Sequence, residues 1–398
     1  MSGYSKRMDY MRGSADIMRQ LFEALGDPGT ISLGGGAPAS IALPVEEIGQ
    51  ITAELFAPGG RGAEMLQYGN PRGLADLRQV VCDHLLAPKG IHADPKNVVI
   101  TSGGLEGLYL TAQVFLDPGD VVLVESPTFV QTLETFQLME ARPIACECDK
   151  DGFVLDKLEA DIQKYKPKLI YVIPTFQNPS GNTTSAPRRK ALAELGAKYD
   201  VLVLEDDPYS EMRYSGEELK PVKYYDKTGH VIYANSFSKI FSPGSRLGYV
   251  YAEGDIIDRM YDVKTATNAH TAMLSQVLCA EYFKRGNYPA HLKYIREVHK
   301  ERRDAMMEAL KEFMPEGVTW TYPDGGLFTW LKVPDHISTS ALFEEVKAAG
   351  VTYLPGIYFY APGQPARDCF MRISFSSNPP EVLREAVRRL AGVLRTKM

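Results

Sequence analysis

Residues 168–207 read KLIYVIPTFQNPSGNTTSAPRRKALAELGAKYDVLVLEDD, and this stretch decides the fold. It begins and ends with short apolar runs, KLIYVIP (168–174) and VLVLEDD (201–207), which are typical of buried β-strands. Between them, residues 184–200 have the periodicity of an α-helix. Two apolar strands joined by a helix predict a parallel pair of strands whose faces are covered by helices.

The same alternation of apolar runs and helical segments continues on both sides of this stretch. The other predicted strands are NVVIT (97–101), VVLVE (121–125), PIACEC (143–148), VIYANSF (231–237) and RLGYVYA (246–252). The sequence therefore predicts an α/β fold with a mostly parallel, seven-stranded sheet sandwiched by helices. In such a sheet, ligands bind beyond the carboxyl ends of the strands.

The character of the sequence changes after about residue 285. A long charged helix (291–313) is followed by a meander-like stretch, a helix, a strand and a terminal helix. The first 60 residues also do not fit the parallel sheet. We therefore expect a large domain of residues 61–289 and a smaller, discontinuous α+β domain of residues 1–60 and 290–398.

The composition argues against several classes of protein. The chain has 398 residues and a formal net charge of −6, which argues against a nucleic-acid-binding protein. The sequence contains no run of about 18 apolar residues that would predict a membrane span. Its first residues, MSGYSKRMDYMRG, lack the apolar core of a signal peptide, so we expect a cytoplasmic protein. Five cysteines without paired spacing predict free thiols and no metal site.

Glycines and polar residues follow the predicted strands at their carboxyl ends. After NVVIT, SGGLEG (102–107) leads directly into a helix. Its glycines fit either a tight turn or a phosphate-binding loop in which backbone N–H groups approach an anion. After KLIYVIP, Asn178 lies in the turn QNPSGNT, where its side chain can also donate to a ligand oxygen.

Three consecutive acids, Glu205, Asp206 and Asp207, end the strand VLVLEDD. Carboxylates are costly to bury unless a cation or a hydrogen-bond donor compensates them. They fit an exposed turn, a magnesium site or a site for an organic cation. The chain has no GxxxxGK[ST] phosphate loop for a nucleotide, which favours the organic cation over magnesium. Tyr209 can bring a phenol to the same place.

Lys239 follows an apolar strand directly in the stretch NSFSKIFSPGSRLGYV (235–250). Ser236, Ser238 and Arg246 around it are anion donors, and the planar fork of an arginine suits a phosphate. Apolar walls and neighbouring cations lower the pKa of a lysine below its usual value of about 10.4. A neutral lysine can form a Schiff base with a carbonyl group. By itself, the stretch also fits a solvated loop.

Taken together, SGGLEG, QNPSGNT, EDDPY and SFSKIFSPGSRLG resemble, in order and spacing, the pyridoxal-phosphate-dependent aminotransferases of fold type I. The most similar subgroup holds kynurenine and 2-aminoadipate aminotransferases and the catalytic halves of MocR-type regulators. The resemblance runs from ISLGGGAP (31–38) and LQYGNPRGLADLR (66–78) to MRISFS (371–376). It implies pyridoxal 5′-phosphate as the cofactor, an amino acid and a 2-oxo acid as substrates, and a homodimer with shared active sites.

The resemblance also implies roles for individual residues. Lys239 would form the Schiff base with the cofactor, and Asp206 would pair with the pyridinium nitrogen. Phe129, where many relatives have tyrosine, would stack on the ring, and Tyr209 and Asn178 would hydrogen-bond its phenolic oxygen. The implied phosphate contacts come from Gly103, Gly104, Leu105, Ser236, Ser238, Arg246 and, from the neighbouring subunit, Tyr68. Because relatives often have serine in place of Gly104, one side-chain donor would be missing.

For the substrate, the resemblance implies that Arg372 clamps the α-carboxylate, with Asn178 beside it. Without the resemblance, a surface ion pair would be the simpler interpretation of Arg372. Gly36 would line the substrate pocket, and Arg19 would gate it from an N-terminal helix. The implied reaction is a ping-pong transamination in which Lys239, Asp206 and Tyr209 are catalytic and Lys239 moves the Cα proton.

Two alternatives remain at this point. The first is another pyridoxal-phosphate enzyme of the same fold, a β-lyase or a decarboxylase, because the cofactor residues are common to these enzymes. The second is a non-enzymatic sensor of the MocR type. We expect no such regulator, because ISLGGGAP begins at residue 31 and leaves no room for a preceding DNA-binding domain.

Overall fold

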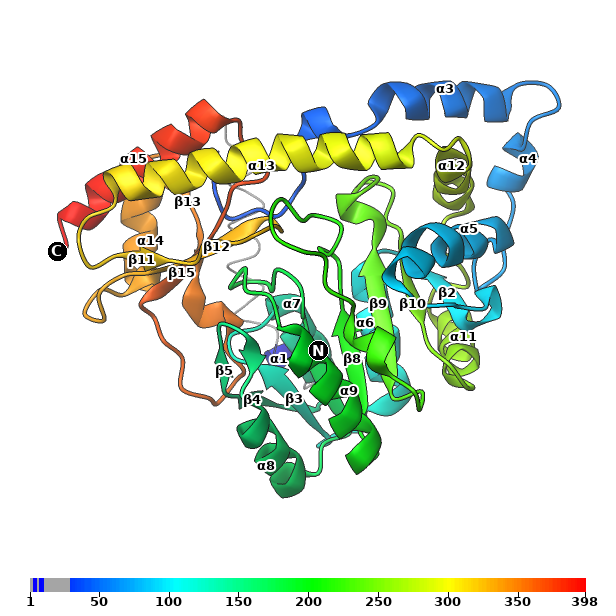
Figure 1. Cartoon of the computed structure of the whole chain (residues 1–398), viewed down its shortest axis with the longest axis horizontal. Helices are drawn as coiled ribbons and strands as arrows, with labels where there is room; N and C mark the ends of the chain where they lie inside the picture. The colour runs from blue at the N-terminus through cyan, green and yellow to red at the C-terminus, as the bar shows by residue number, and fades with distance from the viewer. Residues whose placement is uncertain (1–2, 6, 11–28) are drawn as a thin grey trace.

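A seven-stranded sheet lies at the centre of the computed structural model, which describes residues 3–5, 7–10 and 29–398 (Figure 1). In their order across the sheet, the strands are β2 (Val98–Thr101), β10 (Gly248–Tyr251), β9 (Val231–Ser236), β8 (Leu202–Asp206), β7 (Leu169–Val172), β3 (Val121–Glu125) and β4 (Arg142–Cys146). Neighbouring strands from β9 to β4 are parallel, and β10 runs antiparallel to both β2 and β9. The predicted mostly parallel, seven-stranded sheet is confirmed.

Helices connect the strands and cover both faces of this sheet. The helical elements of this part are α4 (Gly62–Met65), α5 (Ala75–Val80), η2 (Val81–Leu86), η3 (Ala87–Lys89), η4 (Pro95–Asn97), α6 (Gly104–Phe115), α7 (Val130–Leu138), α8 (Leu155–Tyr165), α9 (Ala186–Tyr199), α10 (Val222–Tyr225), η5 (Phe237–Lys239), α11 (Ile256–Thr267) and α12 (Met273–Lys284). A short hairpin of β5 (Cys148–Asp149) and β6 (Gly152–Phe153) follows β4, where the sequence predicts one longer strand.

The side chains of each strand alternate between two apolar layers. Tyr171 of β7 and Leu204 of β8 pack in the layer that contains α6, α7 and α11. Val172 and Val203 pack on the opposite face with α8 and α9. Because the strands are buried on both faces, their sequences are continuously apolar, as the opening stretch of the sequence indicated.

A second, four-stranded antiparallel sheet lies to the left of the large sheet in Figure 1. Its strands, in order, are β11 (Thr319–Trp320), β12 (Phe328–Lys332), β15 (Phe370–Ser374) and β14 (Leu354–Pro355). The helical elements of this part are α13 (Tyr288–Phe313), α14 (Thr339–Ala348), η6 (Gly356–Phe359) and α15 (Pro380–Arg395). The long helix α13 runs along the top of both sheets (Figure 1). It contributes buried side chains to the apolar core on one face of the large sheet and to the apolar core of the small sheet.

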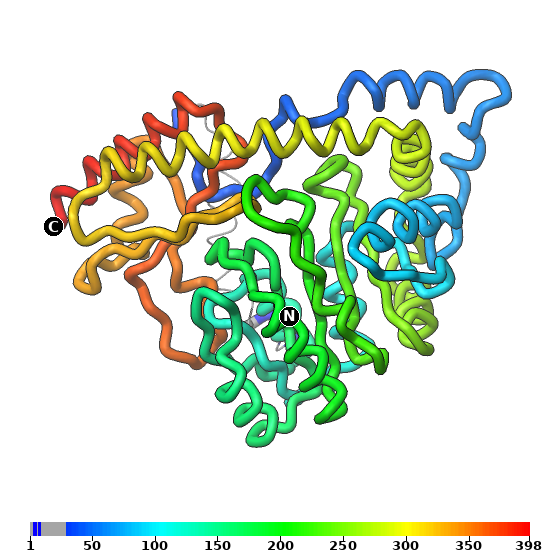
Figure 2. The backbone as a smooth tube through the Cα atoms, viewed as in Figure 1, coloured from blue at the N-terminus to red at the C-terminus, as the bar shows by residue number. Residues whose placement is uncertain are grey.

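The N-terminal segment contacts both parts of the molecule. The blue tube in Figure 2 runs along the top from the small-sheet side to the large-sheet side. Its first strand, β1 (Ile31–Ser32), pairs in parallel with β13 (Val351–Thr352) beside the small sheet. Further along, α3 (Val45–Phe56) buries Ile51 and Leu55 in the apolar cluster that contains α5 and α12. The remaining short helices of this segment are α1 (Arg7–Tyr10) and η1 (Ser40–Ala42).

We propose that the chain forms a large domain of residues 61–289 and a small domain of residues 1–60 and 290–398. The separate sheets and the β1–β13 pair support this division. The packing of α3 favours assigning that helix to the large domain. None of the helices within the described residues is long and apolar enough to cross a lipid bilayer.

Candidate active site

The carboxyl ends of β8 and β9 and the N-terminus of α6 meet at one edge of the large sheet. Asp206 is the last residue of β8, Ser236 is the last residue of β9, and Gly103 immediately precedes α6. β7, β8 and β9 are parallel, so their carboxyl ends lie at the same edge. This edge brings together most of the site residues that the sequence predicts.

Gly103 and Arg246 form the first part of the site. Gly103 has φ of 85° and ψ of 167°, a conformation that is essentially restricted to glycine. A Cβ atom on Gly103 would lie 2.3 Å from Nη2 of Arg246, so the guanidinium packs directly against this glycine. Arg246 donates to the carbonyl of Pro243 (3.3 Å) and forms no ion pair with a carboxylate of the described residues.

Backbone N–H groups and two hydroxyl groups adjoin this guanidinium. The first N–H groups of α6, including those of Gly104 and Leu105, have no acceptor within the helix. A Cβ atom on Gly104 would lie 3.3 Å from the Cβ of Ser236. The Oγ of Ser236 accepts from the N–H of Ser238 (3.1 Å) and donates to the Oγ of Ser238 (2.9 Å). Donors, a helix N-terminus and an unpaired cation suit an anion such as a phosphate.

Lys239 ends the helical turn η5, which follows β9. Its Nζ donates to the carbonyl oxygen of Gly36 (2.7 Å). Burial, together with the nearby charges of Arg372 and Arg246, lowers the pKa of Lys239 to about 8. A substantial fraction of this amine is therefore neutral, and hence nucleophilic, near physiological pH.

Asp206 is almost fully buried, and its carboxylate forms no ion pair within the described residues. Burial raises the pKa of Asp206 to about 7; a hydrogen bond from Tyr171 lowers it, and the charge of Asp207 raises it further. Oδ2 of Asp206 accepts from the hydroxyl group of Tyr171 (2.7 Å). A buried carboxylate of this kind is suited to bind a cationic group of a ligand.

Arg372 lies on β15 of the small sheet and is buried without a carboxylate partner among the described residues. It donates through Nη1 to Oδ1 of Asn178 (2.8 Å) and through Nη2 to the carbonyl oxygen of Gly34 (2.6 Å). Its Cζ lies 4.0 Å from the centre of the Phe328 ring. Nε has no hydrogen-bond partner within the described residues, and burial lowers the pKa of Arg372 to about 10. The surface ion pair considered for this arginine is absent from the described residues.

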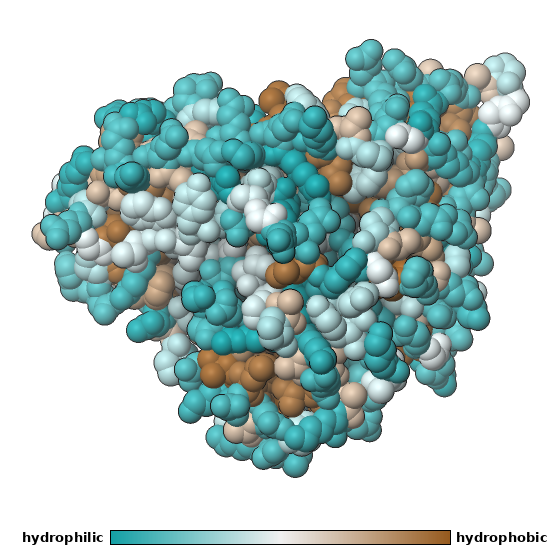
Figure 3. Space-filling model, in the orientation of Figure 1, coloured by the Kyte–Doolittle hydropathy of each residue, from teal (hydrophilic) through white to brown (hydrophobic). Residues whose placement is uncertain are grey.

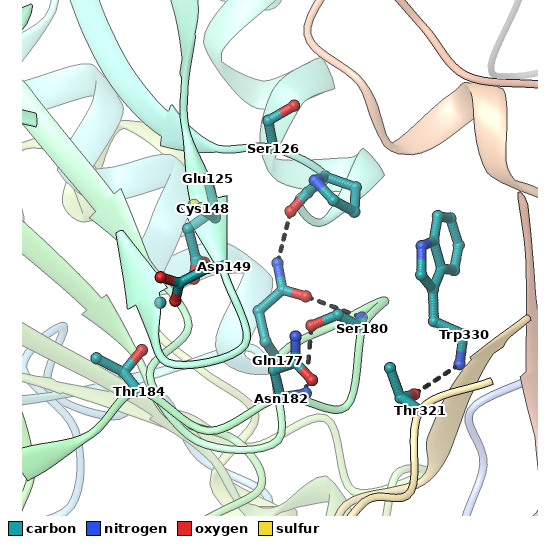
Figure 4. A pocket seen from close by; sticks show the side chains of 12 residues that line it. Glu125, Ser126, Cys148, Asp149, Gln177, Ser180, Asn182, Thr184, Thr321 and Trp330 are labelled. Atoms are coloured by element: carbon teal, nitrogen blue, oxygen red, sulfur yellow. Dashed lines mark hydrogen bonds between the residues drawn. The ribbon is translucent and has the colours of Figure 1, made fainter. Parts of the chain in front are cut away.

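Asn178 is held in place by the side chain of its neighbour Gln177. Gln177 lies at the wall of a cavity (Figure 4), whose volume is about 130 Å³. Its Nε2 donates to the carbonyl oxygen of Pro127 (2.7 Å), and its Oε1 accepts from the N–H of Ser180 (2.9 Å). The first bond ties the turn after β7 to the turn after β3, and the second closes the turn that contains Asn178, whose side chain contacts Arg372.

Three further predicted residues lie around this group. Tyr209 is buried, and its ring meets that of Phe328 edge-on at 6.0 Å between centres. Burial raises the pKa of Tyr209, and the charge of Arg372 opposes this effect. Phe129 precedes α7 and packs against the apolar core on one face of the large sheet and against the apolar core of the small sheet. A Cβ atom on Gly36 would lie 2.6 Å from the Phe328 ring, so only glycine fits without a shift.

Two predicted residues do not join this group within the single chain. Tyr68 is 86% exposed, and its ring contacts His270 edge-on at 5.7 Å between centres. Arg19 lies outside the described residues.

Four residues in and around the site were not predicted from the sequence. Phe328 stacks on Arg372, Tyr171 donates to Asp206, and Thr132 of α7 donates to the hydroxyl oxygen of Tyr171 (3.0 Å). Glu125, which ends β3, is also buried; burial raises its pKa to about 8. A tyrosine and a glutamate in otherwise apolar strands were the available signals in the sequence.

Comparison with known proteins identifies the family. The family model described as aminotransferase class I and II matches residues 31–390. The chain is 39% identical over 389 residues to aromatic-amino-acid aminotransferase 1 of Thermococcus litoralis, an alignment that covers 96% of this chain and 92% of that protein.

Solved structures of two aminotransferases have the same fold. One is the kynurenine aminotransferase of Pyrococcus horikoshii, with a TM-score of 0.93 and 38% identity, covering 99% of this chain and 97% of that one. The other is the α-aminoadipate aminotransferase of Thermus thermophilus, in complex with N-(5′-phosphopyridoxyl)-L-leucine, with a TM-score of 0.91 and 31% identity, covering 99% and 97%. The chain therefore belongs to the class I and II aminotransferases and is a pyridoxal-phosphate-dependent transaminase.

Proposed function

We propose that this transaminase moves the amino group of an L-amino acid of 2-aminoadipate, aromatic or branched-chain type to a 2-oxo acid such as 2-oxoglutarate. The observation that carries the proposal is Arg372, a buried guanidinium without a carboxylate partner among the described residues, which also lowers the pKa of the amine of Lys239. Amino acids and 2-oxo acids share an α-carboxylate, and one arginine can bind both. The names of the relatives above support the aromatic and 2-aminoadipate types, and the leucine adduct in the Thermus thermophilus structure supports the branched-chain type.

The residues of the site fit pyridoxal phosphate. We propose that its phosphate is bound at the N-terminus of α6, by N–H groups of Gly104 and Leu105 beside Gly103, and by the side chains of Ser236, Ser238 and Arg246. The close packing of Arg246 on Gly103 and its lack of a carboxylate partner in the described part support this role. An incoming phosphate would supply the missing negative charge.

The buried acid and its neighbours fit the ring of the cofactor. We propose that Asp206 pairs with the ring nitrogen and that Phe129 stacks on the ring. Tyr209 and Asn178 would donate hydrogen bonds to its phenolic oxygen. The burial of Asp206 without a cation among the described residues supports its role, because a protonated ring nitrogen would compensate its charge.

Pyridoxal phosphate supplies an aldehyde that bonds to amines and a ring that takes up the electron pair released at the substrate Cα. The proposed role of Lys239 is to hold the cofactor covalently and, as a neutral amine, to take the proton from Cα. Its lowered pKa supports both roles. Asp206 would keep the ring nitrogen protonated, and Tyr209 would orient the ring.

Arg372, with Asn178 beside it, would hold the α-carboxylate and so fix the orientation of Cα toward Lys239. The unpaired Nε of Arg372 and the position of its guanidinium over the Phe328 ring support this role, because the guanidinium is held in place with one donor still unused. Gly36, whose carbonyl oxygen accepts from Lys239, would line the pocket for the substrate side chain. Arg19 would gate this pocket.

We also propose a homodimer in which Tyr68 reaches the phosphate site of the neighbouring subunit. Large apolar side chains are exposed in this segment and on the neighbouring α12; they are Ile41 (62%), Val45 (72%), Leu66 (73%), Tyr68 (86%) and Leu274 (42%). Figure 3 shows hydrophobic residues among hydrophilic ones near α3, at the top of the molecule. Burial of such side chains would favour association.

A cytoplasmic location is also proposed, because all five cysteines are free thiols, as is typical of a reducing compartment. Fractionation of the source cells tests this, and recovery of the protein outside the cytoplasm would contradict it.

Gly103→Ala is expected to weaken the binding of pyridoxal phosphate about tenfold or more, because the added Cβ displaces Arg246 and strains the backbone. Gly119→Ala is the matched control, since Gly119 also has a positive φ (90°) but lies in open space. Absorbance titrations of the cofactor-free protein with pyridoxal phosphate and with pyridoxal provide the measurement. Equal loss of affinity for both forms would contradict a role in phosphate binding.

The rate at which the cofactor-free protein captures pyridoxal phosphate covalently should rise with pH through about 8, as Lys239 loses its proton. Arg372→Met removes a nearby positive charge, which raises the pKa of Lys239 and shifts this profile to higher pH. Arg384→Met, on the exposed side of α15, is the control and should leave the profile unchanged. Stopped-flow absorbance provides the rates. A profile that Arg372→Met does not shift would exclude this coupling.

The purified protein, given 2-oxoglutarate and each of a panel of L-amino acids, should form glutamate and the matching 2-oxo acid in equal amounts. Lys239→Ala should abolish this reaction. Release of ammonia or carbon dioxide without glutamate would instead identify a β-lyase or a decarboxylase.

In the same assay, Arg372→Met should raise KM about 30- to 1,000-fold for both the amino acid and the 2-oxo acid, because both lose the ion pair to their carboxylate. Amines that lack a carboxylate serve as the control, and their turnover should change little. An effect on only one of the two substrates would contradict a shared carboxylate site.

Mixed dimers test the proposed role of Tyr68. Co-expressed Tyr68→Ala and Lys239→Ala chains should recover up to about one quarter of the wild-type activity at limiting cofactor, since half of the dimers carry one intact site. Asp206→Ala mixed with Lys239→Ala is the control, because both of these residues belong to the same chain's site and no intact site can form. No recovery in the first mixture would refute a shared site.

A further inference from the structure

Three side chains form a hydrogen-bonded chain that ends on the carboxylate of Asp206. The Oγ1 of Thr132 donates to the hydroxyl oxygen of Tyr171 (3.0 Å), and the hydroxyl of Tyr171 donates to Oδ2 of Asp206 (2.7 Å). All three residues are buried, and the ring of Tyr171 is fully inaccessible. No other side chain within the described residues donates to the Asp206 carboxylate.

Strand geometry brings these groups together from three separate elements. Tyr171 on β7 lies opposite Leu204 on β8, so it is diagonal to Asp206 on the same face of the sheet. Thr132 projects from α7, which covers that face. The phenol of Tyr171 therefore reaches the carboxylate from inside the apolar layer, away from the edge where a ligand would bind.

The titratable groups around Asp206 do not favour its ionised form, so the hydrogen bond from Tyr171 matters for the charge of this carboxylate. Asp207 follows it in the chain and raises its pKa. Glu125 and Tyr209 also interact with it electrostatically, and neither can supply positive charge. Burial and the neighbouring acid thus favour the protonated form of Asp206, and Tyr171 is the group that opposes them.

We propose that Tyr171, oriented by Thr132, is a positioning residue that keeps Asp206 ionised for its contact with the ring nitrogen of the cofactor. The inference rests on the proposed function, since it extends the role assigned there to Asp206. In this arrangement, Oδ2 of Asp206 accepts the hydrogen bond from Tyr171, and Oδ1 would accept one from the ring nitrogen of the cofactor.

The matched pair of variants is Tyr171→Phe and Tyr233→Phe. Tyr233 is a second fully buried tyrosine, on β9, whose hydroxyl donates to Oδ2 of Asp207 at the same distance of 2.7 Å. It packs on the opposite face of the sheet, in the cluster with α12. Each substitution removes one buried hydroxyl from one of two consecutive carboxylates, so their difference isolates the contact with Asp206.

The measurement is the dissociation constant of the cofactor-free protein for 4-deoxypyridoxine 5′-phosphate, which lacks the aldehyde and so reports non-covalent binding. At neutral pH, Tyr171→Phe should raise this constant about 10- to 100-fold, as expected for a hydrogen bond to a charged group. Tyr233→Phe should leave it within about twofold of the wild type, because Asp207 does not face the cofactor. Thr132→Val should give a smaller increase than Tyr171→Phe.

Two further measurements exclude a merely structural role. The ratio of the Tyr171→Phe constant to the wild-type constant should fall toward one at alkaline pH, because Asp206 is then ionised before binding in both proteins. An analogue in which carbon replaces the ring nitrogen should bind both proteins equally. A ratio that is independent of pH, or an equal loss of affinity for this analogue, would overturn the inference.

Asp206→Asn separates this inference from the proposed function. If Asp206→Asn and Tyr171→Phe both weaken binding of the nitrogen-containing ligand, both proposals stand. If Asp206→Asn weakens it and Tyr171→Phe does not, only the role of Tyr171 fails. If Asp206→Asn has no effect, the proposed role of Asp206 fails, and the inference about Tyr171 fails with it.

Discussion

The parallel pairing of β7, β8 and β9 is the constraint on which the rest of the site depends. Parallel strands end at the same edge of a sheet, so the turn after β7, the acid that ends β8 and the lysine that follows β9 meet there although they are distant in sequence. The antiparallel strand β10 then returns the chain to β2 and brings Arg246 against Gly103. The hydrogen bonds between the strands thus fix the positions of the backbone segments that carry these side chains.

The edge holds charged groups that the described residues leave without a counter-charge. Arg372 and Asp206 are buried without an ion pair, Arg246 has only a backbone acceptor, and Lys239 is partly buried near two arginines. Such groups are costly to remove from water. A phosphate, a protonated ring nitrogen and an α-carboxylate would supply counter-charges for Arg246, Asp206 and Arg372, respectively, and would offset the unfavourable free energy of leaving these groups unpaired.

The side chains of the three consecutive acids in the EDD sequence point in different directions, because successive residues of a strand face opposite sides of the sheet. Glu205 accepts from the backbone N–H groups of Val222 and Lys223 (2.8 Å each) and so fixes the start of α10. Asp206 points to the opposite face, toward Tyr171. Asp207 points back to the first face, where its carboxylate accepts from the hydroxyl group of Tyr233. A magnesium site would need these carboxylates to converge, whereas Asp206 points to the opposite face from the other two, and all three accept hydrogen bonds from the protein.

The sequence by itself determined the seven strands, their mostly parallel arrangement and the residues that follow them, because continuous apolar runs and glycine or proline turns are local signals. It also indicated Lys239, Asp206 and Asn178, since each stands beside such a run. Only the tertiary structure decided that Tyr171 and Thr132 reach Asp206, that Gln177 locks the turn of Asn178, and that Arg372 lacks an ion pair among the described residues. These contacts depend on strand register and on the packing of segments that are distant in sequence. Neither produces a local pattern of residues that can be recognised in one sequence.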